Sequence, residues 1–242
     1  MNHSLFKLIA MTTIATTTTA SLAQETQAMS QQASYIEITS ANDQAENLGR
    51  FLAGAAPIVA ETEPGTALWF ALKGPDNTLA IFDVFVNEGA REEHFAGAVA
   101  AALKQNSGQL IKGGWDDGVV ANVQNSSVLS YKAPVALPSA TTATYIKIEA
   151  ASGQSDALAE LLTAAGPIVT DTEPKTLYWV ALRLDEDNFA IFDIFADNSG
   201  REAHFAGRVA NLLREKSSEL VNGGWDSGVV ANVSNFEILA TK

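Results

Sequence analysis

Residues 63–85 have the sequence EPGTALWFALKGPDNTLAIFDVF. Two apolar runs, residues 66–72 and 79–86, flank the turn residues Gly74-Pro75-Asp76-Asn77, and this pattern predicts a β-hairpin. Both faces of the hairpin are apolar, with Trp69, Ala71 and Ile81 on one face and Leu68, Phe70, Leu72 and Phe82 on or near the other. A sheet that is apolar on both faces needs a layer on each side, so we expect two such layers.

The elements around the hairpin follow from the hydrophobic period of the sequence. The spacing predicts a strand over 35–39, helices over 43–59 and 90–105, and a last strand over 119–123 and 128–131 with a break at Asn125. Asn42 or Asp43 would cap the first helix. The order is β-α-β-β-α-β, the ferredoxin-like unit, in which both helices cover one face of a four-stranded sheet.

This unit occurs twice in the chain, at an offset of 110 residues. The offset carries Ala80-Ile81-Phe82-Asp83 onto Ala190-Ile191-Phe192-Asp193, and about half of the paired positions are identical. We therefore expect one domain over 34–132, a Pro-containing linker over 133–143 and a second domain over 144–242. The predicted fold class is α+β, with tandem ferredoxin-like (βαββαβ) units packed sheet to sheet and their helices outside.

The first residues have the features of a secretory signal peptide. Lys7 precedes a short apolar run, and small residues precede a polar segment, which predicts a signal peptide over 1–23 with cleavage after Ala23. A disordered or amphipathic N-terminus is the alternative. We expect residues 24–33 to be disordered and the mature protein, without His3, to be periplasmic or secreted.

The composition excludes several classes of function. Without cysteine, the chain can form no disulfide, thiolate metal site or Cys nucleophile. The net charge of -13 argues against nucleic acid as a partner, and no apolar stretch is long enough for a membrane span. Of the three histidines, His94 and His204 lie a domain apart, so a shared metal ion is not expected.

The segments Glu63-Pro64-Gly65, Ala80-Ile81-Phe82-Asp83-Val84-Phe85 and Arg91-Glu92-Glu93-His94 resemble the antibiotic biosynthesis monooxygenase family, and the second copy repeats the pattern. The resemblance implies ferredoxin-like units that close into a dimeric α+β barrel, here within one chain. It also implies oxidation of a quinol-type or polycyclic aromatic molecule by dioxygen, with no cofactor and no metal.

Two features depart from the family. Many members have a second His soon after the first, whereas Phe95 follows His94 here. The haem-degrading members use a strand-one Asn, a helix Trp and a His ten residues later. This chain has no Asn in strand one, His94 at the Trp position and Lys104 ten residues on, so haem degradation is disfavoured.

Oxygenation without a cofactor requires a base, an apolar pocket and a donor for the developing oxyanion. The candidate bases are His94 and His204. The mid-strand carboxyls Asp83 and Asp193 would orient the histidines or act as alternative bases, since desolvation raises the pKa of an unpaired carboxyl. The candidate substrate-binding residues are Trp69 and Trp179, with the indole N–H as donor, and Arg91 and Arg201.

Each of these residues also has a structural interpretation. The histidines could cap a helix, Asp83 could accept hydrogen bonds from Arg91, and the tryptophans of the strands could be core residues. Trp115 and Trp225, which follow Gly-Gly, are expected to close a barrel end.

The sequence thus favours a monomeric pseudo-dimer that oxidises a small aromatic substrate with dioxygen, and leaves a higher oligomer open. The alternative is a non-catalytic binder of a small apolar ligand, or a stress-related protein, on the same barrel.

Overall fold

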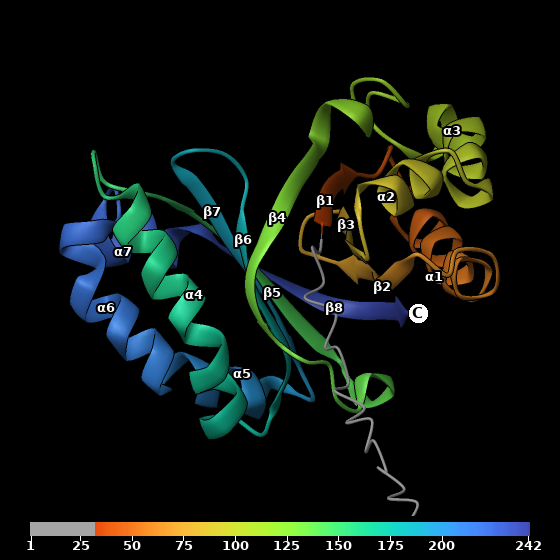
Figure 1. Ribbon diagram of the computed structural model, residues 1–242. Coiled ribbons are helices and arrows are strands. Elements are labelled where there is room, and N and C mark those ends of the chain that lie inside the picture. Colours follow the sequence, from red (N-terminus) through yellow and green to blue (C-terminus); the bar gives the residue numbers. More distant parts are fainter. Residues whose placement is uncertain (1–31) are drawn as a thin grey trace, which may run out of the picture.

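The computed structural model of the protein describes residues 32–242, which form a closed antiparallel β-barrel with helices on its outside (Figure 1). The strand order around the barrel is β1-β3-β2-β8-β5-β7-β6-β4. The strands are β1 (Gln32–Thr39), β2 (Thr66–Lys73), β3 (Thr78–Phe85), β4 (Val123–Lys132), β5 (Thr142–Glu149), β6 (Thr176–Arg183), β7 (Asn188–Phe195) and β8 (Val233–Thr241). The predicted fold class, tandem ferredoxin-like units in a dimeric α+β barrel within one chain, is confirmed.

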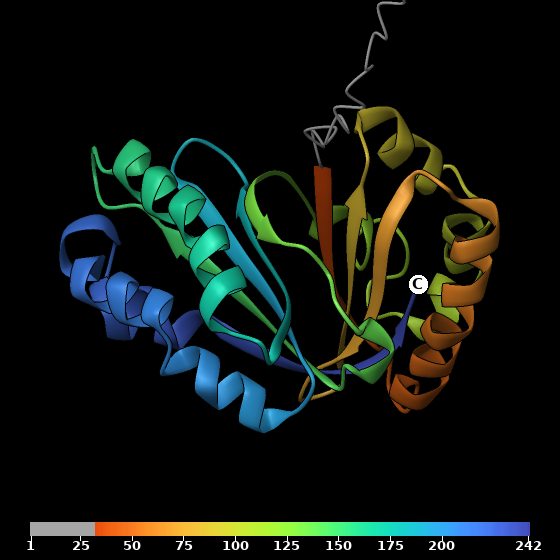
Figure 2. The ribbon, with the colours of Figure 1, turned by 60° about the horizontal axis from the view of Figure 1, so that its bottom comes forward.

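The helices form two groups, one for each repeat, on opposite flanks of the barrel. Figure 2 shows the strands between these two groups. The helices are α1 (Ala45–Thr62), α2 (Glu88–Phe95), α3 (Ala98–Leu110), α4 (Ser155–Thr172), α5 (Asn198–Phe205), α6 (Arg208–Leu220) and α7 (Gly224–Gly228), with short 3-10 turns at Val120–Asn122, Leu137–Ser139 and Val230–Asn232. Within residues 32–242, no helix has the length and apolar character that a membrane span requires.

The last strand of each repeat joins the two sheets. β4 pairs with β1 of its own repeat and then, from Ser127 to Lys132, with β6 of the other repeat. β8 pairs in the same way with β5 and then with β2, and Figure 1 shows its end lying beside β2. Because each repeat lends its last strand to the other, the barrel closes without an open edge.

The two faces of the hairpin pack as the sequence predicts. Phe70, Leu72 and Phe82 point into the barrel, and the Phe82 ring stacks on Phe192 at a centroid distance of 3.8 Å. Trp69 and Ala71 belong to the separate core between the sheet and the helices, and the second repeat has its own core of the same kind. The protein therefore has one shared barrel interior and two separate helix–sheet cores.

The predicted helix over 90–105 is in fact two helices, which are separated at Ala96-Gly97. Gly97 is needed at the break, because a Cβ there would lie 2.9 Å from Glu63 Oε1 and 3.0 Å from the backbone oxygen of His94. The break therefore allows Glu63 to approach the end of α2. Helical periodicity did not reveal it, since both halves keep an apolar face.

Other expectations about local structure are also corrected. The N-cap of α1 is Gln44 and makes no side-chain capping bond, so neither Asn42 nor Asp43 caps that helix. β4 continues through Asn125, because pairing with β1 spans that position. Trp115 packs in the helix–sheet core, so it does not close a barrel end.

Most of the predicted N-terminal region lies outside the described residues. The predicted signal peptide, residues 1–23, lies outside them entirely. β1 begins at Gln32, because Gln32 and Ala33 pair with Phe85 and Val84 of β3, so residues 32 and 33 of the segment expected to be disordered form strand. Residues 133–143 contain one 3-10 turn and the first residues of β5.

Candidate active site

The candidate residues meet on the helix-facing side of the sheet. In the antiparallel ladder, Asp83 of β3 lies opposite both Trp69 of β2 and Ser34 of β1, and directly opposed residues share a face. Helix α2 starts shortly after β3, where the Asn87 side chain accepts from the Ala90 backbone N–H at 2.9 Å and caps the helix. Two turns later, this helix brings the His94 ring next to Asp83.

Three side chains form the centre of the site in the first repeat. His94 Nδ1 lies 2.5 Å from Glu63 Oε2, and His94 Nε2 lies 3.7 Å from Asp83 Oδ2. The Thr66 hydroxyl donates to the same Glu63 oxygen at 3.0 Å. A carboxylate next to Nδ1 favours a proton on that nitrogen, so Nε2 is the ring nitrogen that faces Asp83 and can gain or lose a proton.

The second repeat has the same arrangement. His204 Nδ1 lies 2.5 Å from Glu173 Oε2, and His204 Nε2 lies 3.6 Å from Asp193 Oδ1. The Thr176 hydroxyl donates to Glu173 Oε2 at 2.9 Å. Each repeat therefore contains a Glu–His–Asp triad of nearly identical geometry.

The two sites differ in how the aspartate is hydrogen-bonded. In the second repeat, the Thr144 hydroxyl donates to Asp193 at 2.8 Å. Its counterpart Ser34 donates instead to Asn125 at 2.7 Å. As a result, neither carboxyl oxygen of Asp83 has a hydrogen-bond partner among residues 32–242.

Burial controls the electrostatics of these aspartates. Both are fully buried. Desolvation raises the pKa of Asp83 from 3.8 to about 7, with His94 opposing the rise and Glu63 adding to it. Desolvation likewise raises the pKa of Asp193 to about 6, and here His204 and the Thr144 hydrogen bond oppose the rise. Burial alone would lower the pKa of His204, but Asp193 and Glu173 outweigh it and the pKa is raised.

An apolar cavity of about 430 Å³ lies beside His94, between the sheet and α3. Its wall is mostly aliphatic and aromatic, formed by Ile36, Trp69, Ile81, His94, Phe95, Val99, Ala100, Leu103, Trp115, Val119, Val120, Val123 and Asn125. The buried indole N–H of Trp69 makes no hydrogen bond within the described part of the chain. A buried donor without a partner is uncommon in a native protein, and the Trp69 side chain is one of those that line the cavity, which is large enough for a small ligand.

The residues that line this cavity recur in the second repeat. At every one of these lining positions, the residue 110 positions later is of the same type, although only about half of all paired positions in the two repeats are identical. Burial alone does not explain this identity, because buried residues of the barrel interior differ between the repeats. Phe70 corresponds to Val180, and Phe236 corresponds to Ser126. In the second repeat, a cavity of about 230 Å³ lies on the Glu173 side of His204.

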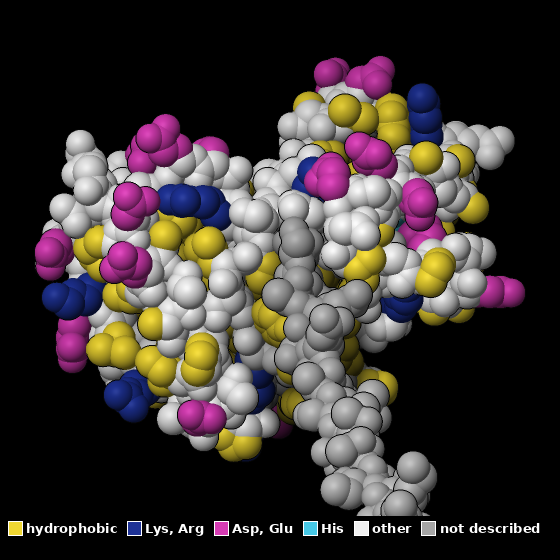
Figure 3. All heavy atoms as spheres, in the orientation of Figure 1, with side chains coloured by type: hydrophobic (Ala, Val, Ile, Leu, Met, Phe, Trp, Pro, Cys, Tyr) yellow, Lys and Arg dark blue, Asp and Glu magenta, His cyan; other side chains and the backbone are white. Residues whose placement is uncertain are grey.

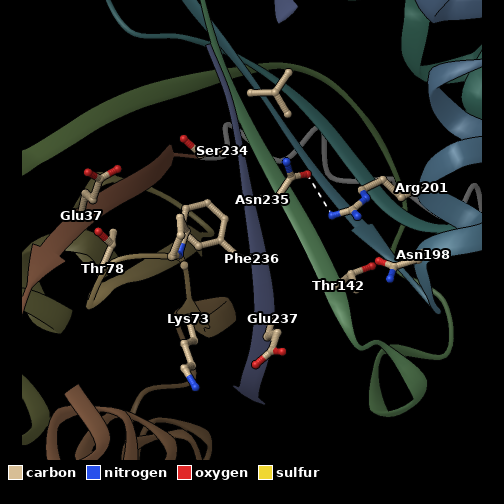
Figure 4. Close-up of a pocket in the computed structure, with 13 residues that line it drawn as sticks. Glu37, Lys73, Thr78, Thr142, Asn198, Arg201, Ser234, Asn235, Phe236 and Glu237 are labelled. Carbon is tan, nitrogen blue, oxygen red and sulfur yellow. Dashed lines mark hydrogen bonds between the residues drawn. The ribbon is translucent and has the colours of Figure 1, made fainter. Parts of the chain in front are cut away.

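The two arginines lie outside the apolar cavity. Arg91 forms an ion pair of 2.5 Å with Glu88 on its own helix, and Asp83 is not its partner. Arg201 donates to Asn235 at 2.9 Å and lines a polar groove of about 650 Å³ where β8 crosses between the repeats (Figure 4). This groove is larger than the apolar cavity, but it contains neither histidine.

Sequence reasoning missed four residues of the sites. Glu63 and Glu173 occur in the sequence analysis only within the segments that carry the family resemblance, and nothing there indicates Lys132 or Lys242, which donate to the backbone oxygens of Glu173 and Glu63. Their identity in both copies was the available signal. Within residues 32–242, no group of three or more His, Asp or Glu side chains, these triads included, is arranged to hold a metal ion. On the face shown in Figure 3, acidic side chains lie on both halves, with fewer basic ones between them.

Solved structures with the same fold include proteins of comparable length. A "putative monooxygenase" from Fusobacterium nucleatum is 13% identical, with a TM-score of 0.74 and coverage of 89% of this chain and 95% of that chain. Another, from Lactobacillus acidophilus, is 13% identical, with a TM-score of 0.71 and coverage of 88% and 95%. An "anthrone oxidase-like protein" is 12% identical, with a TM-score of 0.57 and coverage of 88% and 93%.

These identities are low, so the likeness concerns the fold. The resemblance to antibiotic biosynthesis monooxygenases is confirmed at that level. No model of a known protein family matches the sequence, and no curated protein matches it.

Proposed function

We propose that the protein is a cofactor-independent monooxygenase that oxidises a quinol-type or polycyclic aromatic molecule with dioxygen. The observation that carries the proposal is the pairing of His94, which lines an apolar cavity, with the fully buried Asp83 next to it. Burial moves the pKa of Asp83 to about 7, and a His lies 3.7 Å away. A base that titrates near neutral pH is suited to proton abstraction at physiological pH.

The cavity suits an aromatic substrate that supplies its own electrons. Its volume of about 430 Å³ and its apolar wall fit a molecule of two or three rings. The indole N–H of Trp69 is a donor without a partner among the described residues, and it can hydrogen-bond an oxyanion on the bound ring. The same residue types at the equivalent positions of the second repeat support the same role for Trp179 and His204.

The chemistry balances without a cofactor when the substrate is an anthrone. The His–Asp pair removes a proton from the reacting CH2 group, and the resulting anion gives electrons to dioxygen to form a C–O bond. The peroxide takes the proton back. Loss of water then breaks the O–O bond and leaves a carbonyl, so that one oxygen atom enters the product and the other enters water. The protein's part is to bind, to exclude water and to hold the proton at His94 Nε2 or Asp83.

Oxygen uptake and isotope incorporation test this proposal. With an anthrone and ¹⁸O2, we expect one dioxygen consumed per anthrone oxidised and one ¹⁸O atom in the product ketone. The same mixture without protein serves as the control for uncatalysed autoxidation. Saturable anthrone binding with no oxygen uptake above that control would contradict oxygenation, and would support the alternative, a binder of small apolar ligands.

A further inference from the structure

A lysine from one repeat contacts the glutamate of the other repeat's site. Lys132, the last residue of β4, is only 5% exposed, and its Nζ donates to the backbone oxygen of Glu173 at 2.6 Å. The carboxyl group of this same Glu173 contacts His204. In reverse, Lys242 Nζ donates to the backbone oxygen of Glu63 at 2.6 Å, and also to that of Thr66.

The crossing of the last strands brings these lysines to the opposite sites. Lys132 pairs with Trp179 in the β4–β6 ladder. The backbone N–H of Lys242 donates to the Trp69 oxygen at 2.9 Å. Each ammonium group therefore reaches the turn that precedes the partner strand, where the glutamate lies.

Space filling alone does not account for these lysines. Burial lowers the pKa of the Lys132 amine, with the nearby Glu173 opposing the change, and the same two effects act on Lys242. An apolar side chain would avoid the cost of burying an ammonium group. Lysine nevertheless occurs in both copies, although the two residues before it differ, Ser130-Tyr131 in one and Ala240-Thr241 in the other.

We infer that Lys132 and Lys242 are positioning residues, each for the histidine of the opposite repeat. The ammonium group holds the peptide of Glu173 or Glu63, so that the carboxyl group meets the imidazole Nδ1 and fixes the ring. Each site is therefore completed by the other repeat. The inference rests on the proposed function only in taking the histidines as the proton-transfer groups.

The ring nitrogens of the histidines, observed by NMR in the full chain, test the crossed arrangement. In Lys132→Met, we expect the signal of the His204 Nδ1 proton to broaden or disappear while that of His94 is unchanged. In Lys242→Met, we expect the reverse. His94→Gln and His204→Gln assign the signals, and Lys147→Met, which changes an exposed lysine, is the matched control.

The direction of a pKa change separates positioning from a through-space charge effect. The charged groups around His204 are Glu173 and Asp193, with Lys132 behind Glu173, and Lys175 and Arg208 at the adjoining cavity. If Lys132→Met releases Glu173, His204 loses a hydrogen bond that raises its pKa, and the pKa should fall. Loss of a nearby positive charge without any movement would raise that pKa instead.

Three results would overturn the inference: a response in the histidine of the same repeat, no response in either, or a rise in the pKa of His204. If Lys132→Met fails to give a cooperative thermal transition, the more exposed Lys242 carries the test by itself. Lys132→Arg keeps a donor and should retain part of the His204 signal. None of these measurements requires turnover, so the crossed pattern can hold even if the oxygenase proposal fails.

Discussion

The Asp83→Asn variant should become more stable relative to the wild type as the pH rises. Asp83 has a pKa of about 7 in the folded protein, against 3.8 as its ordinary value. Between these two pH values, the unfolded chain releases a proton that the folded protein keeps, so this carboxyl group lowers the stability of the wild type as the pH increases. Its favourable contribution is complete below about pH 4 and is lost by about pH 7. Because Asn cannot ionise, the stability of the variant does not contain this decrease with pH.

The size of the effect follows from the pKa change. About three units at about 1.36 kcal/mol each correspond to about 4 kcal/mol. The amide of Asn has its own cost in a buried site, about 1–3 kcal/mol, but that cost does not depend on pH. We therefore expect the free energy of unfolding of Asp83→Asn, minus that of the wild type, to rise by about 4 kcal/mol between pH 4 and pH 8.

Urea denaturation at a series of pH values measures this difference. Asp193→Asn gives an internal comparison, since the Asp193 pKa is about 6 and the rise should be about 3 kcal/mol and complete about one pH unit earlier. Asp117→Asn, at an exposed position, should stay within about 0.5 kcal/mol of the wild type throughout. A difference for Asp83→Asn that is constant from pH 4 to pH 8 would show that this carboxyl is not desolvated as the structure indicates.

Three further predictions concern the sites, the barrel and export. The His94→Ala/His204→Ala double variant should lose about 100- to 10,000-fold in turnover of an anthrone while binding it nearly as well. Each single variant then reports how much of the turnover its own repeat contributes. A folded double variant with full turnover would transfer the role of base to Asp83 and Asp193. Residues 34–132 expressed alone should dimerise or aggregate, because the apolar interior that Phe70 and Phe82 face would be exposed; a stable monomer in analytical ultracentrifugation would contradict the shared barrel. We also propose export with cleavage after Ala23, so N-terminal sequencing of protein from its native host should begin near Gln24, whereas a pool that retains Met1 would refute cleavage.

Local patterns in the sequence determined much of the fold. Alternation along residues 66–72 and 79–86 assigned Trp69 and Phe82 to different faces of the hairpin, which the structure confirms, and the structure adds that Trp69 faces the helices and Phe82 the barrel interior. The offset of 110 residues revealed the duplication. These signals are readable because side-chain period and repeats depend only on neighbouring or equivalent positions in the chain. His94, Asp83 and Trp69 became candidates through the chemistry that the family resemblance implies, and the structure places them close together.

Only the tertiary structure decided how the sites are assembled. Glu63 meets His94 across 31 residues, because a helix break at Gly97 opens the space for its carboxyl group. Lys132 reaches Glu173 because the last strand of one repeat ends in the sheet of the other. Neither contact leaves a periodic trace in the sequence, because each depends on strand register and on packing between distant segments. The family resemblance therefore indicated most of the chemical groups, while the helix break and the crossing of the strands decided which of them lie together.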